Sequence, residues 1–509
     1  MRFQPLALIK LTMSFTILAC ICCGPVSYAV ELPTTRFLEV VPGDEATRST
    51  PFLAWFKDLA EDGYIEEEYA VYGDANVYAY TNEAEQDAGV EIQTPGIPYA
   101  TRMLIRRPAR CGQRGPKPRA ACPKFNGTVY VEVLNATAGW DGDPIWQSTH
   151  EYMIREGAVW VGISTKPVTV DFLRDSWGNP PWPPRNATRY TDLAMPEFGQ
   201  VWDMLSQIGS LLKSADSQWN PLADLDVRRQ IMVGYSQSAS YQVTYANSFH
   251  DDAKLDDGSH VYDGYYISAG GSSAKHVTGP TDSTPENLPL GDNRTLTQVD
   301  APVIRFQTQT EVVLFPSFPV RQSEDDYPNL RFYEMAGGSH VDAQLNAVGG
   351  QALVRDLGLP PSFCPAPVLP YNPIQIGFVQ SALMASLERW IAKGDEPPPS
   401  RFMELTLSSG VTQLARDADG NAVGGVRPPE IQAPRGTYVE TNTGPGFCFL
   451  FGGFQPFDED KLGSLYPKRS SYFRELNQAI AKSRLEGFLL PEDAWTLRRR
   501  ALEESLSNR

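Results

Sequence analysis

Three side chains in this sequence have the types and the chain order that nucleophilic acyl transfer needs: Ser236, Glu311 and His340. A serine hydroxyl is a weak nucleophile near neutral pH, so an imidazole must accept its proton as it attacks a carbonyl carbon. A carboxylate orients that imidazole and stabilises its protonated form. We therefore predict that Ser236 is a nucleophile, His340 a general base and Glu311 the acid that supports the base.

The predicted nucleophile is the middle residue of Gly-Tyr-Ser-Gln-Ser at 234–238. Apolar residues 231–233 predict a strand before it, and residues 239–247 predict a helix after it. A serine at such a sharp turn projects its Oγ above the sheet, and small neighbours are needed because the two backbones nearly touch. Ser238 stands where glycine is usual, and it is small enough to fit. The motif alone leaves an ordinary serine in a strand-to-helix turn as an equal alternative.

The predicted acid and base each follow a predicted strand. Residues 301–307 predict a strand that runs into Glu311, and residues 330–335 predict a strand followed by a glycine-containing loop that ends at His340. The chain has five histidines, so a chance histidine in that loop is uncommon. Taken singly, each of the two could be a solvated surface group. Their joint order and placement favour catalysis.

The negative charge that develops on the attacked oxygen needs backbone N–H donors. One donor is predicted at Gln237, which follows the nucleophile at the start of the helix. Residues 128–134 predict an earlier strand, and the loop of small residues after it is predicted to supply the second donor, at Thr137 or at Ala136. Asn135 in this loop begins an Asn-Ala-Thr triplet, so a glycan is a competing interpretation that would crowd the loop.

Several segments together resemble a little-characterised family of large serine hydrolases. They are the Gly-Tyr-Ser-Gln-Ser turn, Val-Glu-Val-Leu-Asn at 131–135, Gln-Thr-Gln-Thr-Glu at 307–311, Glu-Met-Ala-Gly-Gly-Ser-His-Val-Asp at 334–342, Leu-Gly-Ser-Leu-Tyr-Pro at 462–467 and Glu-Gly-Phe-Leu-Leu-Pro-Glu-Asp-Ala at 486–494. The resemblance implies an α/β-hydrolase fold, with a mostly parallel central sheet flanked by helices. It also implies a triad at the matching positions and esterase-like activity on unspecified substrates. Glu311 departs from the Asp of the family pattern, which changes the geometry at the strand end and keeps the chemistry.

The length and composition predict one elaborated domain. The chain has 509 residues, of which 42% are hydrophobic and 11% aromatic, enough for a large core. We predict a single α/β-hydrolase domain over residues 30–509, with loop insertions. Its parts are N-terminal strands and a connector (30–124), a catalytic core (125–345), and C-terminal helices with an extension (346–509).

Residues 1–29 predict a secretion signal. Arg2 and Lys10 precede an apolar run at 11–23, and small residues at 27–29 suit cleavage. A membrane anchor is the alternative, but the run is shorter than the roughly 20 residues that a span needs. A lipoprotein signal is a weaker alternative. We therefore predict a secreted, extracellular protein without a stable membrane span.

Four cysteines lie outside that signal, namely Cys111, Cys122, Cys364 and Cys448. An even number in an oxidising compartment predicts disulfides, and four cysteines allow three pairings. We favour Cys111 with Cys122, because they flank a short loop, and by elimination Cys364 with Cys448. No spacing of cysteines or histidines supports a metal site, and no cofactor is predicted.

Possible glycosylation sites and the net charge agree with the prediction of a secreted protein. The Asn-x-Ser/Thr triplets at Asn126, Asn135, Asn186 and Asn293 are consistent with glycans, although such triplets arise readily by chance. The net charge of -17 disfavours nucleic acid as a partner. The same charge repels anionic substrates, which favours neutral small molecules such as esters or lactones. The oligomeric state is not predicted.

Aromatic residues near the predicted catalytic loops are candidates for a substrate pocket. Trp140 and Trp146 follow the predicted oxyanion loop, and Trp182 lies in a segment rich in proline and aromatic residues. They could line a pocket for an apolar acyl group. Ordinary packing between loop and core is the alternative for each.

Together these observations predict a secreted serine hydrolase that cleaves a carboxylic ester or lactone through an acyl-enzyme on Ser236. One alternative is a peptidase or acyltransferase that uses the same triad. The other is a non-catalytic binding protein on a hydrolase scaffold. All three triad candidates are present, which disfavours the binding protein.

Overall fold

A computed structural model describes residues 30–40, 49–82, 89–109, 124–186, 188–278, 295–297, 299–315, 317–408 and 410–507. The predicted signal peptide, the predicted Cys111–Cys122 disulfide and the triplet at Asn293 lie outside these residues.

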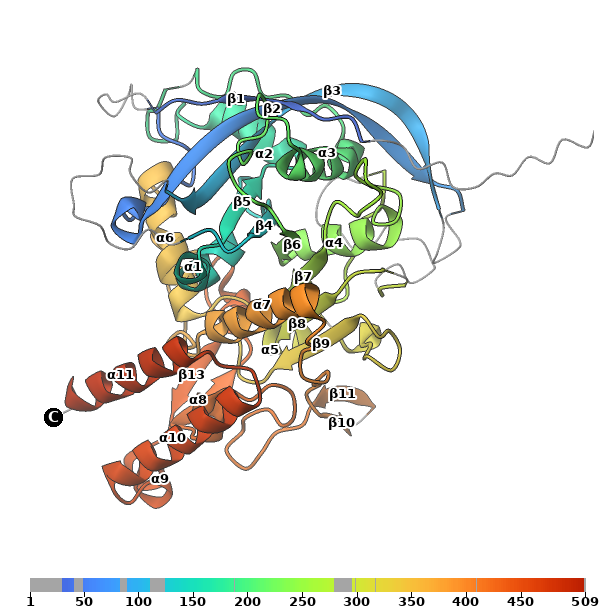
Figure 1. The fold of residues 1–509 in the computed structure, drawn as a ribbon. Coiled ribbons are helices and arrows are strands. Elements are labelled where there is room, and N and C mark those ends of the chain that lie inside the picture. Colours follow the sequence, from blue (N-terminus) through green and yellow to red (C-terminus); the bar gives the residue numbers. More distant parts are fainter. Residues whose placement is uncertain are drawn as a thin grey trace, which may run out of the picture.

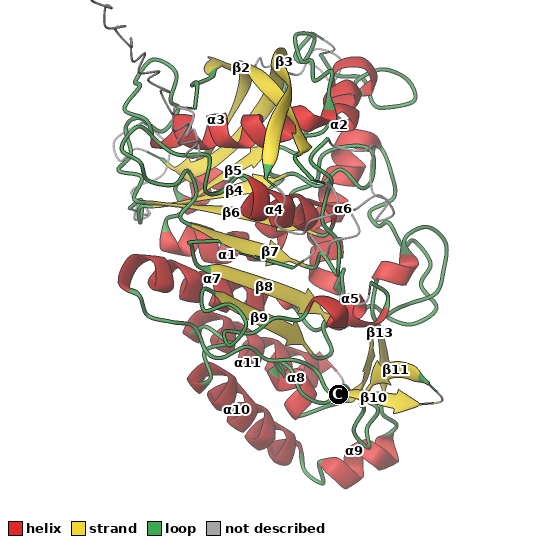
Figure 2. Ribbon diagram, turned by 90° about the vertical axis from the view of Figure 1, so that its right-hand side faces the viewer, coloured by secondary structure: helices red, strands yellow, loops and turns green. Residues whose placement is uncertain are grey.

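Nine strands of the described chain form one sheet in the order β1-β2-β3-β5-β4-β6-β7-β8-β9. Their bounds are β1 (Thr34–Phe37), β2 (Tyr64–Tyr80), β3 (Val90–Pro108), β4 (Thr128–Val133), β5 (Val159–Ile163), β6 (Arg229–Tyr235), β7 (Gly264–Ser268), β8 (Val303–Thr308) and β9 (Leu330–Met335). Strands β5, β4, β6, β7, β8 and β9 run parallel, and Figure 2 shows them stacked in this order. The long β2 and β3 extend the sheet antiparallel, with β3 on β5.

Helices cover both faces of this sheet. Their bounds are α1 (Pro144–Glu156), α2 (Pro167–Asp171), α3 (Val201–Lys213), α4 (Gln237–Ser248), α5 (Gln309–Val313), α6 (Ala343–Leu357), α7 (Ile376–Lys393), α8 (Pro429–Gln432), α9 (Glu459–Leu465), α10 (Arg469–Leu485) and α11 (Pro491–Ser507). The helices α3 and α4 pack on one face, and α1 and α7 pack on the other (Figure 1). The predicted α/β-hydrolase fold class is therefore confirmed.

The strands bury both faces because their side chains alternate. In β4, Val129, Val131 and Val133 belong to the core beneath α3 and α4, while Tyr130 belongs to the core beneath α1 and α7. A parallel strand that is buried on both sides reads as a continuous apolar run, which is why the strand is visible in the sequence. The predicted strands at 128–134, 231–233, 301–307 and 330–335 correspond to β4, β6, β8 and β9.

The chain beyond α7 lies within the region predicted as C-terminal helices and extension. It contains two small antiparallel sheets, β10 (Leu405–Ser408) with β11 (Val411–Leu414) and β12 (Gly436–Val439) with β13 (Gly453–Pro456). The helices α10 and α11 pack around a separate apolar cluster that includes Leu476, Ile480 and Leu497. Across the described residues, none of the helices combines the length and apolar character needed to cross a bilayer.

Candidate active site

Ser236 occupies the sharp turn between β6 and α4. Its backbone angles are φ 59° and ψ −124°, a region that a residue with a side chain rarely adopts. Such strain persists only where the surrounding structure enforces it, and it is typical of functional turns. Here the Ser236 N–H donates to Ser268 O on the neighbouring strand β7 at 2.9 Å. The predicted strand, turn and helix are therefore present, with Ser236 at the turn.

The structure explains why Ser238 can replace the usual glycine. A Cβ placed on Gly234 would lie 3.2 Å from the Ser238 Cβ, so the two positions face each other across the turn. Because Gly234 has no side chain, the serine fits opposite it. The Ser238 side chain is fully buried, and its Oγ lies 3.4 Å from Nζ of Lys166.

Glu311 and His340 are joined directly. His340 Nδ1 donates to Glu311 Oε1 at 2.5 Å, and Glu311 is completely buried. The other carboxylate oxygen, Oε2, accepts from the Thr308 N–H at 2.7 Å and from the Thr308 hydroxyl at 2.6 Å. This is a capping box at the start of α5, so Glu311 lies on a short helix just beyond the end of β8.

The environment keeps Glu311 ionised. Burial alone would raise the pKa of this carboxyl group, but the facing His340 and the hydrogen bonds from His340 and Thr308 hold it below its ordinary value. An ionised Glu311 accepts a hydrogen bond from the Nδ1–H of His340. The other ring nitrogen, Nε2, is thereby the one left to exchange protons.

The loop that carries His340 is anchored on three sides. The His340 N–H donates to Thr310 Oγ1 at 3.0 Å, and Gly337 N–H donates to Gln309 Oε1 at 2.7 Å. The Tyr235 hydroxyl donates to the His340 carbonyl oxygen at 2.6 Å. The residue next to Ser236 thus contacts the residue predicted as the base. Ser236 and His340 line the same pocket. Their two described side chains are not joined by a hydrogen bond of normal geometry. Such contacts are often long in unliganded enzymes and tighten with substrate.

The predicted oxyanion donors are backbone N–H groups near Ser236. Gln237 is the first residue of α4, so its N–H has no partner within the helix. The Thr137 N–H, predicted as the second donor, instead donates to Asn135 Oδ1 at 2.8 Å. The Ala136 N–H faces the turn and donates to the Gln237 side chain at 3.0 Å. Each of the two amides is thus bonded to a side-chain oxygen, and both stay candidates for the second donor.

The predicted glycan sites differ in how their side chains are used. Asn135 lines the pocket and donates from Nδ2 to Tyr235 O at 2.9 Å, so a glycan there would fill the site. Asn126 Nδ2 donates to Glu388 at 3.3 Å. Asn186 is half-buried and accepts from Thr188 through Oδ1. Of these three asparagines, Asn186 is the one whose Nδ2 donates no hydrogen bond to another described residue.

Sequence reasoning missed Lys166. This residue follows β5 and is almost completely buried, and burial lowers the pKa of its ammonium group to about 7. Its Nζ donates to Leu134 O at the end of β4, and it also lies 4.7 Å from the ring of Tyr241. Lys166 thus ties the loop after β4 to the turn at Ser238. A lysine directly after an apolar strand was the available signal.

The pocket beside Ser236 and His340 is open to solvent, and the empty space in and around it, open solvent included, is about 970 Å³. Trp140 lines it, as predicted. Trp146 does not, because it is fully buried among Trp55, Trp160 and the guanidinium of Arg106. Trp182 lies behind Trp140, with ring centroids 5.8 Å apart, and is not part of the lining. The alternative of core packing therefore applies to these two tryptophans.

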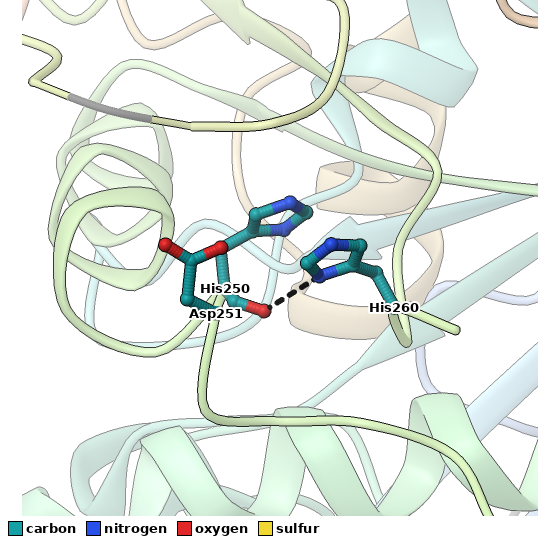
Figure 3. Close-up of side chains that lie close together, drawn as sticks. All are labelled: His250, Asp251 and His260. Carbon is teal, nitrogen blue, oxygen red and sulfur yellow. Dashed lines mark hydrogen bonds between the residues drawn. The ribbon is translucent and has the colours of Figure 1, made fainter. Parts of the chain in front are cut away.

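A second group of titratable side chains lies away from this pocket. In the described chain, His250, Asp251 and His260 form the group whose possible metal-ligand atoms all lie within 4.8 Å (Figure 3). The two imidazoles stack 4.0 Å apart at an angle of 5°. A bound metal ion lies close to the plane of each imidazole, and two stacked parallel planes do not meet at bonding distance. The arrangement therefore does not fit an ion shared by both histidines.

We expect His250 to make stability depend on pH. Burial, with repulsion from His260 and Lys254, lowers the pKa of His250 to about 3, against an ordinary value of 6.5. Between these values the unfolded chain binds a proton that the folded chain does not, so stability falls as pH falls. Between roughly pH 7 and pH 4, the free energy of unfolding should therefore fall less in His250→Asn than in the native protein. Unfolding by denaturant at each pH measures this. His276→Asn controls for loss of an imidazole, and equal slopes in all three proteins would contradict the assignment.

Comparisons with known proteins were made for the whole chain. The model of a family described as alpha/beta hydrolase domain matches residues 39–499. A comparison with curated proteins found no significant match.

Similar solved structures include a methylesterase, an α/β serine hydrolase without lid from Xanthomonas campestris and a carboxylesterase from Lactobacillus plantarum. The methylesterase is 12% identical at a TM-score of 0.29, and the match covers 64% of this chain and 57% of that protein. The Xanthomonas protein is 10% identical at a TM-score of 0.27, and the match covers 51% of this chain and 91% of that protein. The Lactobacillus protein is 11% identical at a TM-score of 0.28, and the match covers 47% of this chain and 78% of that protein. These values are too low to transfer the activity of those proteins to this chain.

Proposed function

The chain belongs to the alpha/beta hydrolase domain family, and on this premise we propose that it is a serine hydrolase that cleaves a carboxylic ester or lactone. The observation that carries the proposal is the Glu311–His340 pair, whose imidazole lines the same pocket as Ser236. Burial and a fixed acid give the imidazole one defined orientation, as a general base needs. The strained turn at Ser236 and the Gln237 amide, which has no partner within its helix, complete the set of groups for acyl transfer.

In the proposed mechanism, Ser236 Oγ attacks the carbonyl carbon while His340 Nε2 takes the hydroxyl proton. Glu311 stabilises the imidazolium through Nδ1–H. The oxyanion is bound by the Gln237 N–H and by one amide of the loop after β4, once the side-chain partner of that amide releases it. Collapse of the intermediate expels the alcohol, which leaves with the proton from His340. Water then repeats the sequence on the acyl-enzyme and frees Ser236.

The proposal includes secretion and a single domain over residues 30–509. The Cys364–Cys448 disulfide is compatible with an oxidising compartment. The two largest apolar clusters lie on the two faces of one sheet, which supports one elaborated domain.

Labelling with a fluorophosphonate probe tests the proposal. Purified protein is treated with the probe, digested, and the adduct located by mass spectrometry. We expect one adduct on Ser236, with none on Ser238 or Ser240, because only Ser236 lines the pocket. Turnover of p-nitrophenyl esters and of matched peptide anilides then separates an esterase from a peptidase. Folded protein without any adduct, or an adduct on another serine, would overturn the proposal.

A further inference from the structure

One wall of the pocket is built by two segments that lie far apart in the sequence, residues 359–372 and 442–452, here called the disulfide cap. Cys364 and Cys448 join the two segments. The Phe447 N–H also donates to Phe363 O at 3.2 Å. Both cysteines are fully buried within an apolar cluster that includes Phe451. The disulfide cap is therefore a packed unit with its own small core.

Glycines let the disulfide cap lie directly against its neighbours. A Cβ on Gly350 of α6 would meet Pro361 O at 2.2 Å, so the cap backbone rests on the helix itself. Within the cap, Gly446 has φ +67°, and a Cβ there would meet Phe363 O at 2.7 Å. Close backbone contact of this kind leaves the cap little freedom to shift relative to α6.

The disulfide cap is also bonded next to the predicted base. The Val341 N–H donates to Leu450 O at 3.0 Å, and Val341 directly follows His340. The cap is thus fixed with respect to the reacting groups.

The surface that the disulfide cap presents to the pocket is aromatic and aliphatic. It consists of Phe363, Phe447, Leu450 and Phe451. Trp140 faces it from the loop after β4 and stacks on Phe363 with ring centroids 6.4 Å apart. Leu345 and Leu353 of α6, with Leu53, extend the apolar lining. Half-buried aromatic rings around an open space are typical of a site that takes an apolar ligand.

The pocket offers no counter-charge to an anionic ligand. Apart from His340 and Tyr235, the ionisable side chain in its lining is Asp141, and no lysine or arginine of the described residues contributes. Burial keeps the Tyr235 hydroxyl protonated, because it raises the pKa of that group well above its usual value. Asp141 is fully buried, and its Oδ2 pairs with Arg102 and accepts from the Ser164 hydroxyl, whereas its Oδ1 has no hydrogen-bond partner among the described residues. An anionic group placed among these apolar side chains would lose its hydration without gaining a partner.

We propose that the substrate is an ester with a bulky, uncharged, apolar group, which packs between Trp140 and the disulfide cap, and that Phe447 and Leu450 determine this specificity. The inference rests on the proposed function and adds its substrate class.

The test uses substrates that differ only in charge or size. On the acyl side, p-nitrophenyl hexanoate is compared with the p-nitrophenyl half-ester of adipic acid and with p-nitrophenyl acetate. On the alcohol side, benzyl acetate is compared with 4-carboxybenzyl acetate. Measurements are repeated at about 1 M NaCl, where the Debye length is about 3 Å, so that repulsion by the acidic protein surface is screened. The uncharged bulky ester should keep a kcat/KM roughly tenfold or more above its charged partner in at least one series.

Variants assign the preference to the disulfide cap. Phe447→Ala should lower kcat/KM for the preferred bulky ester roughly tenfold, with p-nitrophenyl acetate little changed. Phe449→Ala is the matched control, because Phe449 lies in the same segment, is 45% exposed and does not line the pocket. Melting temperatures show whether each variant is folded. If Phe447→Ala does not fold, Leu450→Ala replaces it in the same comparison.

The outcomes separate the inference from the proposed function. If the native protein is neither labelled at Ser236 nor active on any ester, the proposed function fails. If it is labelled and cleaves p-nitrophenyl acetate but shows no preference for uncharged bulky esters at high salt, the inference alone is overturned. An equal effect of Phe447→Ala and Phe449→Ala would also overturn it.

Discussion

Replacing Ser236 with alanine is expected to lower kcat for ester hydrolysis by roughly 10⁵- to 10⁶-fold, because the covalent route disappears with the hydroxyl. Alanine keeps the Cβ, so the strained turn and the Ser236 N–H bond to Ser268 O remain. The Gln237 amide and those of the loop after β4 are also retained, and they account for a residual rate above that of water. Initial rates with a p-nitrophenyl ester at saturating concentration measure the effect.

Ser240→Ala is the control for this prediction. Ser240 lies one turn further along α4, is buried, and donates its hydroxyl to the Gln237 carbonyl oxygen. Its removal should change kcat only a few-fold, since the bond is local to the helix. If Ser236→Ala kept its activity within roughly tenfold of the native protein, the nucleophile would have to be another group.

Glu311→Gln is expected to lower kcat by roughly 10⁴-fold, with little change in the overall fold. The Thr308 N–H and hydroxyl both donate to Oε2, and the N–H can only donate. A glutamine must therefore turn its oxygen to Thr308 and its NH₂ group to His340. That amide donates to Nδ1 and selects the tautomer with the proton on Nε2, which cannot accept the Ser236 proton. The loss should appear in kcat, measured at saturating ester and constant pH.

Glu440→Gln is the matched control for the acid. Glu440 accepts from Gln309 of α5 at 2.8 Å and pairs with Arg416, but it does not contact His340. It should leave kcat nearly unchanged. Glu311→Asp should fall between the native protein and Glu311→Gln, because its shorter side chain reaches Thr308 or His340 but not both. Activity of Glu311→Gln close to that of the native protein would reduce Glu311 to a helix-capping residue.

Part of the candidate site could be predicted from the sequence, because the patterns that indicate it are formed by neighbouring residues. Buried parallel strands are continuous apolar runs, so β4, β6, β8 and β9 and the residues that follow them could be located from sequence. The position of Glu311 on a helix turn was missed, although Thr308 and Glu311 carry the three-residue spacing of a capping box. The pairing of Cys364 with Cys448 followed by elimination, and the structure contains that disulfide.

The sequence by itself determined the fold class and the order of Ser236, Glu311 and His340 along it, because strand periodicity and turn composition are properties of neighbouring residues. Only the tertiary structure decided which side chains meet. Trp146 and Trp140 lie six residues apart, yet the first is packed in the core and the second lines the pocket. The contact of Lys166 with Ser238 and the disulfide cap beside His340 are likewise invisible in the sequence. Such contacts depend on how distant segments pack against one another, and no local pattern of residues encodes that packing.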